Sequence, residues 1–138
     1  MPRTLSSLTL AEARRMIAAG ERKADELKIP YNLAVVDAGG ALLAQIRMDG
    51  AWLGSIQLAI DKAWTARAFE RATDQLATVA QSGQPAFGIH TSNSGRVVIF
   101  GGGVPVSIDA VVIGAVGASG GTVEQDIVVA RAAVAALT

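Results

Sequence analysis

The sequence predicts a mixed α/β (α+β) fold in which one five-stranded antiparallel sheet carries helices on both faces. Short β-prone segments follow one another across tight turns, which makes neighbouring strands antiparallel. Apolar residues at helical spacing occur before, between and after these segments, and no βαβαβ series is present. The chain has 138 residues, 51% of them apolar, so we expect one domain over residues 1–138 with a substantial core.

Four helices are expected, and two of them begin at capping boxes, in which a Thr and a Glu or Gln three residues later satisfy each other's backbone N–H groups. The first capping box, at Thr9, opens a helix over residues 10–28. The second, at Thr122, opens a final helix that is nearly all Val and Ala, so we expect that helix to be largely buried. Apolar periodicity predicts a helix over residues 53–70. Thr73–Leu76 resembles the start of a short third helix, which the segment Gln81–Pro85 ends.

Five strands are expected from runs of β-prone residues. Two of them form a hairpin across the turn Asp37–Gly40, and two form another across Asp109–Ala110. Pro105 suits a strand start or an edge strand, because proline cannot donate a hydrogen bond to a neighbouring strand. The expected ranges are residues 31–36, 41–47, 96–100, 104–108 and 111–116.

Composition excludes several classes of partner and site. The 12 basic and 12 acidic residues give a formal net charge of +0 without a basic cluster, so we expect no nucleic acid and no anionic membrane as partner. The absence of cysteine excludes disulfides and thiolate-ligated metals. The N-terminus lacks the apolar core of a signal peptide, and no apolar run is long enough to span a bilayer, so a cytoplasmic location is expected.

Two glycine-dense segments, residues 101–103 and 114–121, flank one short apolar stretch. Glycine is used where backbone turns tightly or where another group approaches the backbone closely. No Gly-Lys-Ser/Thr follows the first segment, which excludes a P-loop. Its three glycines predict either a backbone nest for a carboxylate or carbonyl, or a β-bulge or corner. These candidate ligand-binding residues are Gly101, Gly102 and Gly103.

The second segment contains a G-x-S-x-G match at residues 117–121 between a strand and a helix. We reject a nucleophile elbow, because the chain is too short for an α/β-hydrolase and because His90 precedes Ser119. Ser119 and Gly120 instead indicate either a weak anion site at a helix N-terminus or a capped turn.

Lys62 is the charged residue with the strongest functional signal. It shares a helix face with the small residues Ser55, Ala59 and Ala66, which suggests close packing or a cavity wall. A lysine there could anchor a carboxylate, act as a base or serve as an amine nucleophile. The alternative is a surface lysine paired with Asp61 or Glu70.

Three further side chains are candidate ligand contacts. Arg47 could clamp a carboxylate, or form a surface pair with Asp49. Arg96 is a second candidate anion contact. His90 is the only imidazole, and it could act as an acid or base, ligate haem iron or serve a structural role.

Five motifs occur in an order that resembles the GlcG/HbpS-like family, which includes the C-terminal domain of PduO. The resemblance implies a profilin-like sandwich with a five-stranded antiparallel sheet, a homo-oligomer, haem binding in some members, and roles in the catabolism of small organic acids. It also implies Thr65 and His90 as candidate haem ligands. The motifs are Val35–Gly40, Arg47–Gly50, Ala59–Ala63, Gly101–Pro105 and Gly114–Gly121, and Gln125-Asp126 follow them.

Three functions follow as hypotheses. The first is a protein that binds a small molecule, haem or a small organic acid, in a glycine-lined pocket; only 4% of residues are aromatic, which counts against a large haem slot. The second is a cofactor-independent isomerase, tautomerase or hydrolytic deaminase acting on small unsaturated or keto acids. In that case Lys62 or Asp37 would move the proton and glycine N–H groups would stabilise an oxyanion. The third is an accessory structural subunit, so the sequence leaves open whether the protein is an enzyme.

Overall fold

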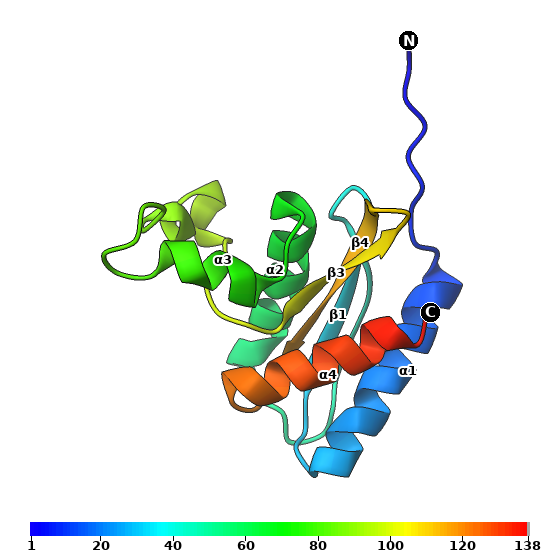
Figure 1. Ribbon diagram of the computed structural model, residues 1–138. Coiled ribbons are helices and arrows are strands. Elements are labelled where there is room, and N and C mark those ends of the chain that lie inside the picture. Colours follow the sequence, from blue (N-terminus) through cyan, green and yellow to red (C-terminus); the bar gives the residue numbers. More distant parts are fainter. Residues whose placement is uncertain (138) are drawn as a thin grey trace.

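A four-stranded antiparallel sheet with strand order β2-β1-β4-β3 forms the centre of the computed structural model, which describes residues 1–137. Figure 1 shows α1 and α4 together on one face of this sheet and α2 on the other, which confirms the mixed α+β fold. Two short 3-10 turns, η1 (Ile89–Thr91) and η2 (Asn93–Gly95), lie between α3 and β3. The longer elements are α1 (Leu10–Leu27), β1 (Asn32–Asp37), β2 (Leu42–Arg47), α2 (Gly54–Phe69), α3 (Thr73–Ala80), β3 (Gly103–Ile108), β4 (Val111–Ser119) and α4 (Val123–Ala135).

The fifth predicted strand, residues 96–100, is wrong: the sheet of the described chain has four strands. Val97 and Val98 are buried as their apolar character requires. The N–H of Val98, however, donates to the side-chain hydroxyl of Thr65 on α2 at 3.1 Å, not to a neighbouring strand. The β-prone residues at this position are therefore buried, but they do not pair with a neighbouring strand.

Both capping boxes and the position of the proline are confirmed. The hydroxyls of Thr9 and Thr122 accept the N–H groups of Glu12 and Gln125 at the starts of α1 and α4. Pro105 lies in β3, which is an edge strand of the sheet. Sequence patterns that span one helical turn thus determine where α1 and α4 begin.

Strand β4 is longer than expected and passes through two glycines of the second glycine-dense segment, so that only Gly120 and Gly121 form the turn before α4. Gly117 faces α2, and a β-carbon there would collide with the backbone carbonyl oxygen of Ala59. The glycine allows the backbone of α2 to lie directly on β4.

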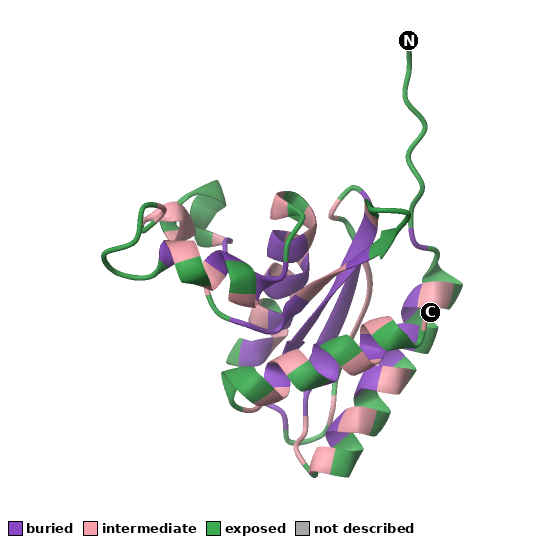
Figure 2. Cartoon of the chain, viewed as in Figure 1, coloured by how far each residue is buried: buried purple, intermediate pink, exposed green. Residues whose placement is uncertain are grey.

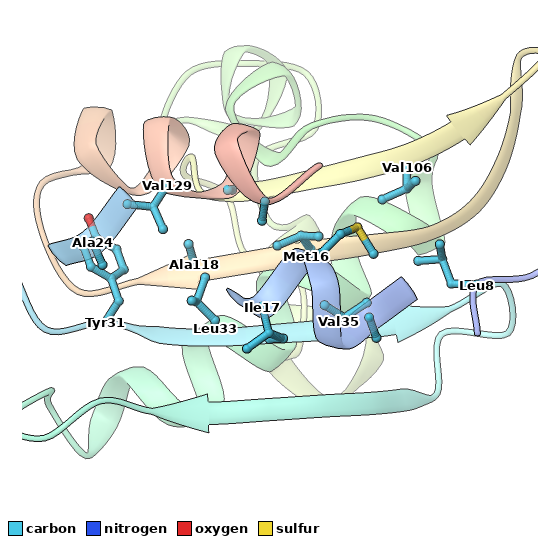
Figure 3. Close-up of a cluster of buried hydrophobic side chains, with 14 of the residues drawn as sticks. Leu8, Met16, Ile17, Ala24, Tyr31, Leu33, Val35, Val106, Ala118 and Val129 are labelled. Carbon is cyan, nitrogen blue, oxygen red and sulfur yellow. The ribbon is translucent and has the colours of Figure 1, made fainter. Parts of the chain in front are cut away.

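The core follows the alternation of the two central strands. Leu33 and Val35 of β1, with Val116 of β4, point to the face covered by α1 and α4, as Figure 3 shows for the first two. Val36 and Ala115 point the other way, against the small residues of α2. Period-two burial on both faces is the pattern of a sheet between two helical layers.

The expectation of a largely buried α4 is wrong in part. Its inner face is buried at residues such as Val129 and Ala133, whereas Val128 is 45% exposed. Figure 2 shows this alternation of buried and exposed turns along α4, which lies beside α1 as the outermost layer.

Among residues 1–137, no helix is both long and apolar enough to cross a membrane.

Replacing Gly117 by alanine tests the close approach of α2. The added methyl group would meet helix backbone, so α2 must shift, and we expect the free energy of unfolding to fall by about 3 kcal/mol. Gly54→Ala, in the first turn of the same helix with open space around it, is the matched control and should change stability by less than about 1 kcal/mol. Urea denaturation of both variants gives the comparison, and equal stabilities would contradict the packing described.

Candidate functional site

Lys62, in the middle of α2, is completely buried and forms an ion pair with Asp126 of α4. Its Nζ lies 2.7 Å from Oδ2 of Asp126 and donates a second hydrogen bond to the carbonyl of Ala118 at 3.1 Å. The helices α2 and α4 cover opposite faces of the sheet. The ion pair connects them beside Gly102, just before the edge strand β3 begins.

Both charges are matched by protein groups. The Oδ1 of Asp126 accepts the N–H groups of Gly120 and Gly121 at 3.2 and 3.0 Å. The ring of Phe100 covers the ammonium, with its centroid 5.1 Å from Nζ. Burial lowers the pKa of the Lys62 ammonium, and the negative charge of Asp126 opposes that shift.

The two glycine-dense segments meet around this ion pair. Gly102 has φ +125°, and a β-carbon on it would lie 2.7 Å from Nζ of Lys62 and 2.6 Å from the carbonyl oxygen of Ala118. The carbonyl of Gly102 accepts the N–H of Ala118 at 2.9 Å. The structure therefore brings Gly101–Gly103 and Ser119–Gly120 together beside Lys62, and the chain's own atoms fill the space between them. Ligand binding at these glycines stays a prediction.

Sequence reasoning missed Asp126 as the partner of Lys62. The alternative that pairs Lys62 with Asp61 or Glu70 is wrong, because both of those carboxylates pair with arginines. The signal was present in α4, where Asp126 shares helical spacing with Val129, Ala130 and Ala133 on the face that becomes buried. A buried lysine needs a buried carboxylate, but 64 residues separate the two in sequence.

Tyr31 places a third polar group beside Asp126. Its side chain is completely buried, and among the described residues its hydroxyl has no hydrogen-bond partner of acceptable geometry. Burial raises the pKa of the Tyr31 hydroxyl, and the nearby negative charge of Asp126 raises it further.

Arg96 and Thr65 form a second group, which lies at α2, away from α1 and α4. Nε of Arg96 donates to Oδ1 of Asp61 at 3.1 Å, and the guanidinium lies 4.6 Å from the ring centroid of Trp64. The buried hydroxyl of Thr65 accepts the N–H of Val98 and lies 3.4 Å from the carbonyl oxygen of Arg96.

His90 lies in η1, on the irregular segment between α3 and β3. Its imidazole makes no hydrogen bond to a described residue, and its Nδ1 is nevertheless buried. The ring of Phe87 lies beside it, with centroids 5.4 Å apart, and Phe87 is 57% exposed. Nowhere in residues 1–137 do three His, Asp or Glu side chains gather as a metal ion would need.

Arg47 and Asp37 lie away from both groups. Arg47 ends the edge strand β2, is exposed, and donates a long hydrogen bond of 3.4 Å to Ala51 without forming an ion pair to any described residue. Oδ1 of Asp37 accepts the N–H groups of Gly39 and Ala41, which closes the turn between β1 and β2. Catalytic roles for Lys62 and Asp37 stay predictions.

A double-mutant cycle tests the buried pair. Lys62→Met leaves an unpaired buried carboxylate, and Asp126→Asn an unpaired buried ammonium, so each should lower the free energy of unfolding by about 3–5 kcal/mol. The double variant should lose clearly less than the sum of the two single variants. Lys23→Met, which removes an exposed pair with Glu26, is the control and should cost less than about 1 kcal/mol. Additive losses at positions 62 and 126 would argue against the coupling.

Tyr31→Phe tests the unpartnered hydroxyl. Because the pKa of Tyr31 is raised in the folded protein, the unfolded chain releases this proton first, so wild-type stability should fall as pH rises above the usual pKa of 10.0. The variant should lack that part of the decline and differ from wild type by less than about 1 kcal/mol at pH 7. Denaturant titrations between neutral and alkaline pH measure both effects. A large loss at pH 7 would reveal a hydrogen bond to this hydroxyl.

The chain is 43% identical over 129 residues to an uncharacterized 15.0 kDa protein of Citrobacter freundii encoded in the dhaT-dhaS intergenic region, covering 94% of this chain and 91% of that protein. It is 39% identical to the corrinoid adenosyltransferase PduO of the same organism, over 95% of this chain but only 39% of PduO.

Among solved structures, a PduOC–haem complex matches with a TM-score of 0.89 and 40% identity, over 94% of both chains. A family model described as haem degrading protein HbpS-like matches residues 8–135. These matches confirm the resemblance seen in the sequence motifs, and the chain belongs to the HbpS-like family.

Proposed function

We propose that this protein binds haem and that His90 is the side chain that ligates the iron. The observation that carries the proposal is the state of the His90 imidazole, which is the only one in the chain and has no hydrogen-bond partner among the described residues. A buried ring nitrogen without a partner costs free energy that a bound metal centre would recover. The haem complex of PduOC, whose structure is similar over nearly the whole chain, supports haem as the ligand.

The surroundings of His90 suit a porphyrin at one edge. Phe87 presents an exposed aromatic ring directly beside the imidazole, and such an apolar surface can pack against a porphyrin. In this arrangement His90 would hold the iron through a ring nitrogen, and Phe87 would cover that bond against water. Bound haem would supply an iron centre that takes axial ligands and changes oxidation state.

His90 is favoured over the other candidate sites. The hydroxyl of Thr65 is buried and already accepts the N–H of Val98, so ligation by Thr65 would break that hydrogen bond. The space beside Gly101–Gly103 is filled by α2 and α4, so a ligand there would have to displace the chain's own packing. His90 can bind without either cost.

We also infer that the protein forms a homo-oligomer. Trp52 and Leu53, at the start of α2, are 67% and 73% exposed and adjacent in sequence. Large apolar side chains gathered on a surface are typical of an interface between subunits.

Titration of the purified protein with haemin tests the proposal. The wild type should shift the Soret band with saturation, and His90→Ala should weaken binding at least about tenfold or abolish the shift. Thr91→Ala, an exposed change in the same 3-10 turn, is the matched control and should bind like wild type. Unchanged binding by His90→Ala would overturn the assignment, and loss in Thr65→Val alone would transfer it to Thr65.

A further inference from the structure

We propose a second site, a carboxylate-binding hollow with Arg96 at its base, between α2 and η2. The hollow has a volume of about 310 Å³, and it is lined by Gln57 and Asp61 of α2 and by residues 93–96. It is separate from the buried ion pair of Lys62, and Asp61 on its wall forms an ion pair with Arg96.

The Arg96 side chain is fixed from two directions. Its Nε donates to Asp61, and its guanidinium lies over the ring of Trp64 at 4.6 Å. Asp61 is itself oriented by Nε2 of Gln57, which donates to the same Oδ1 at 2.9 Å. An arginine held in this way has already lost the side-chain freedom that ligand binding would otherwise cost.

The free edge of Arg96 is the part that would recognise a ligand. Its two terminal nitrogens, Nη1 and Nη2, have no hydrogen-bond partner among residues 1–137, while the side chain is 37% exposed. Two parallel N–H donors match the two oxygens of a carboxylate, which is the strongest geometry for this pair.

The turn opposite α2 is held in an unusual conformation. Asn93, Ser94 and Gly95 have φ angles of 52°, 58° and 76°, so two residues other than glycine adopt the left-handed region in succession. Glycine and asparagine adopt this region readily, whereas for Ser94 it costs roughly 1–2 kcal/mol relative to ordinary backbone. Strain of this kind is typical of functional sites, and here it carries two polar side chains to the rim of the hollow.

The charges favour a carboxylate over a more highly charged anion. Asp61 offsets the positive charge of Arg96, so a phosphate would meet repulsion from this carboxylate without a second cation to compensate. The carboxylate could belong to a free organic acid or to a propionate of haem. Haem as the source rests on the proposed function, since it requires haem to bind at His90. The two sites are close in sequence, because η2 follows soon after η1, which carries His90.

Trp64 provides a direct readout of free acids. In a Trp52→Phe background, which removes the exposed second tryptophan, emission of Trp64 should respond saturably to acetate or benzoate but not to acetamide or to chloride at equal ionic strength. Arg96→Gln should abolish the response. Arg96→Lys, which keeps the charge without the paired donors, should weaken it at least about tenfold.

A second experiment compares the binding of haem with that of its dimethyl ester, which lacks free carboxylates. If haem is the source, Arg96→Gln should weaken haem binding several-fold and leave binding of the ester unchanged. A dependence on Arg96 in either arm supports the site and identifies the source. No saturable response to free acids, together with equal haem and ester binding, would overturn it. Failure of the His90 proposal can be told apart from failure of this one. If His90 is not the ligand, His90→Ala keeps the Soret shift, whatever the emission of Trp64 shows.

Discussion

The ion pair between Lys62 and Asp126 is the constraint on which the rest of this structure depends. It joins helices on opposite faces of the sheet, and it can form only where the chain leaves room beyond the start of β3. Gly102 leaves that room, since a β-carbon on it would lie 2.7 Å from Nζ of Lys62, while Gly103 lets the backbone of α2 approach β3. Gly120 and Gly121 supply the N–H groups that bind the other carboxylate oxygen. Three of the glycines near the end of the chain, Gly102, Gly120 and Gly121, therefore contact this ion pair directly.

This arrangement packs the glycine segments around the buried ion pair. A buried charge is costly unless protein groups compensate it, and here two hydrogen bonds and the Phe100 ring surround the ammonium. Two amides and the ammonium bind the carboxylate. Amide groups committed to Asp126 are unavailable to an oxyanion. The geometry thus gives Lys62 a structural task, and a catalytic role would require this network to open.

Local patterns predicted the fold better than they predicted the site. The capping boxes at Thr9 and Thr122 and the hairpin turns depend on residues a few positions apart, so their signals lie within one sequence window. The false strand at residues 96–100 shows the limit, because burial against α2 gives the same composition as strand pairing. Asp126 shows a second limit. Sequence could indicate that Lys62 is buried, but only the path of the chain brings a carboxylate from α4 beside it.

A ligand is more readily bound by polar groups that the fold has left uncommitted. Around Lys62 the Tyr31 hydroxyl is the one buried side-chain group without a hydrogen-bond partner among residues 1–137. On the irregular segment before β3, by contrast, the His90 imidazole and the terminal nitrogens of Arg96 have no protein partner among the described residues, and both lie near exposed surface. Because forming a site there breaks no existing hydrogen bond, the free energy of binding is not spent on disrupting the core. The same reasoning separates the two regions: the buried pair holds the layers together, and under the proposed function the segment between α3 and β3 would meet the ligand.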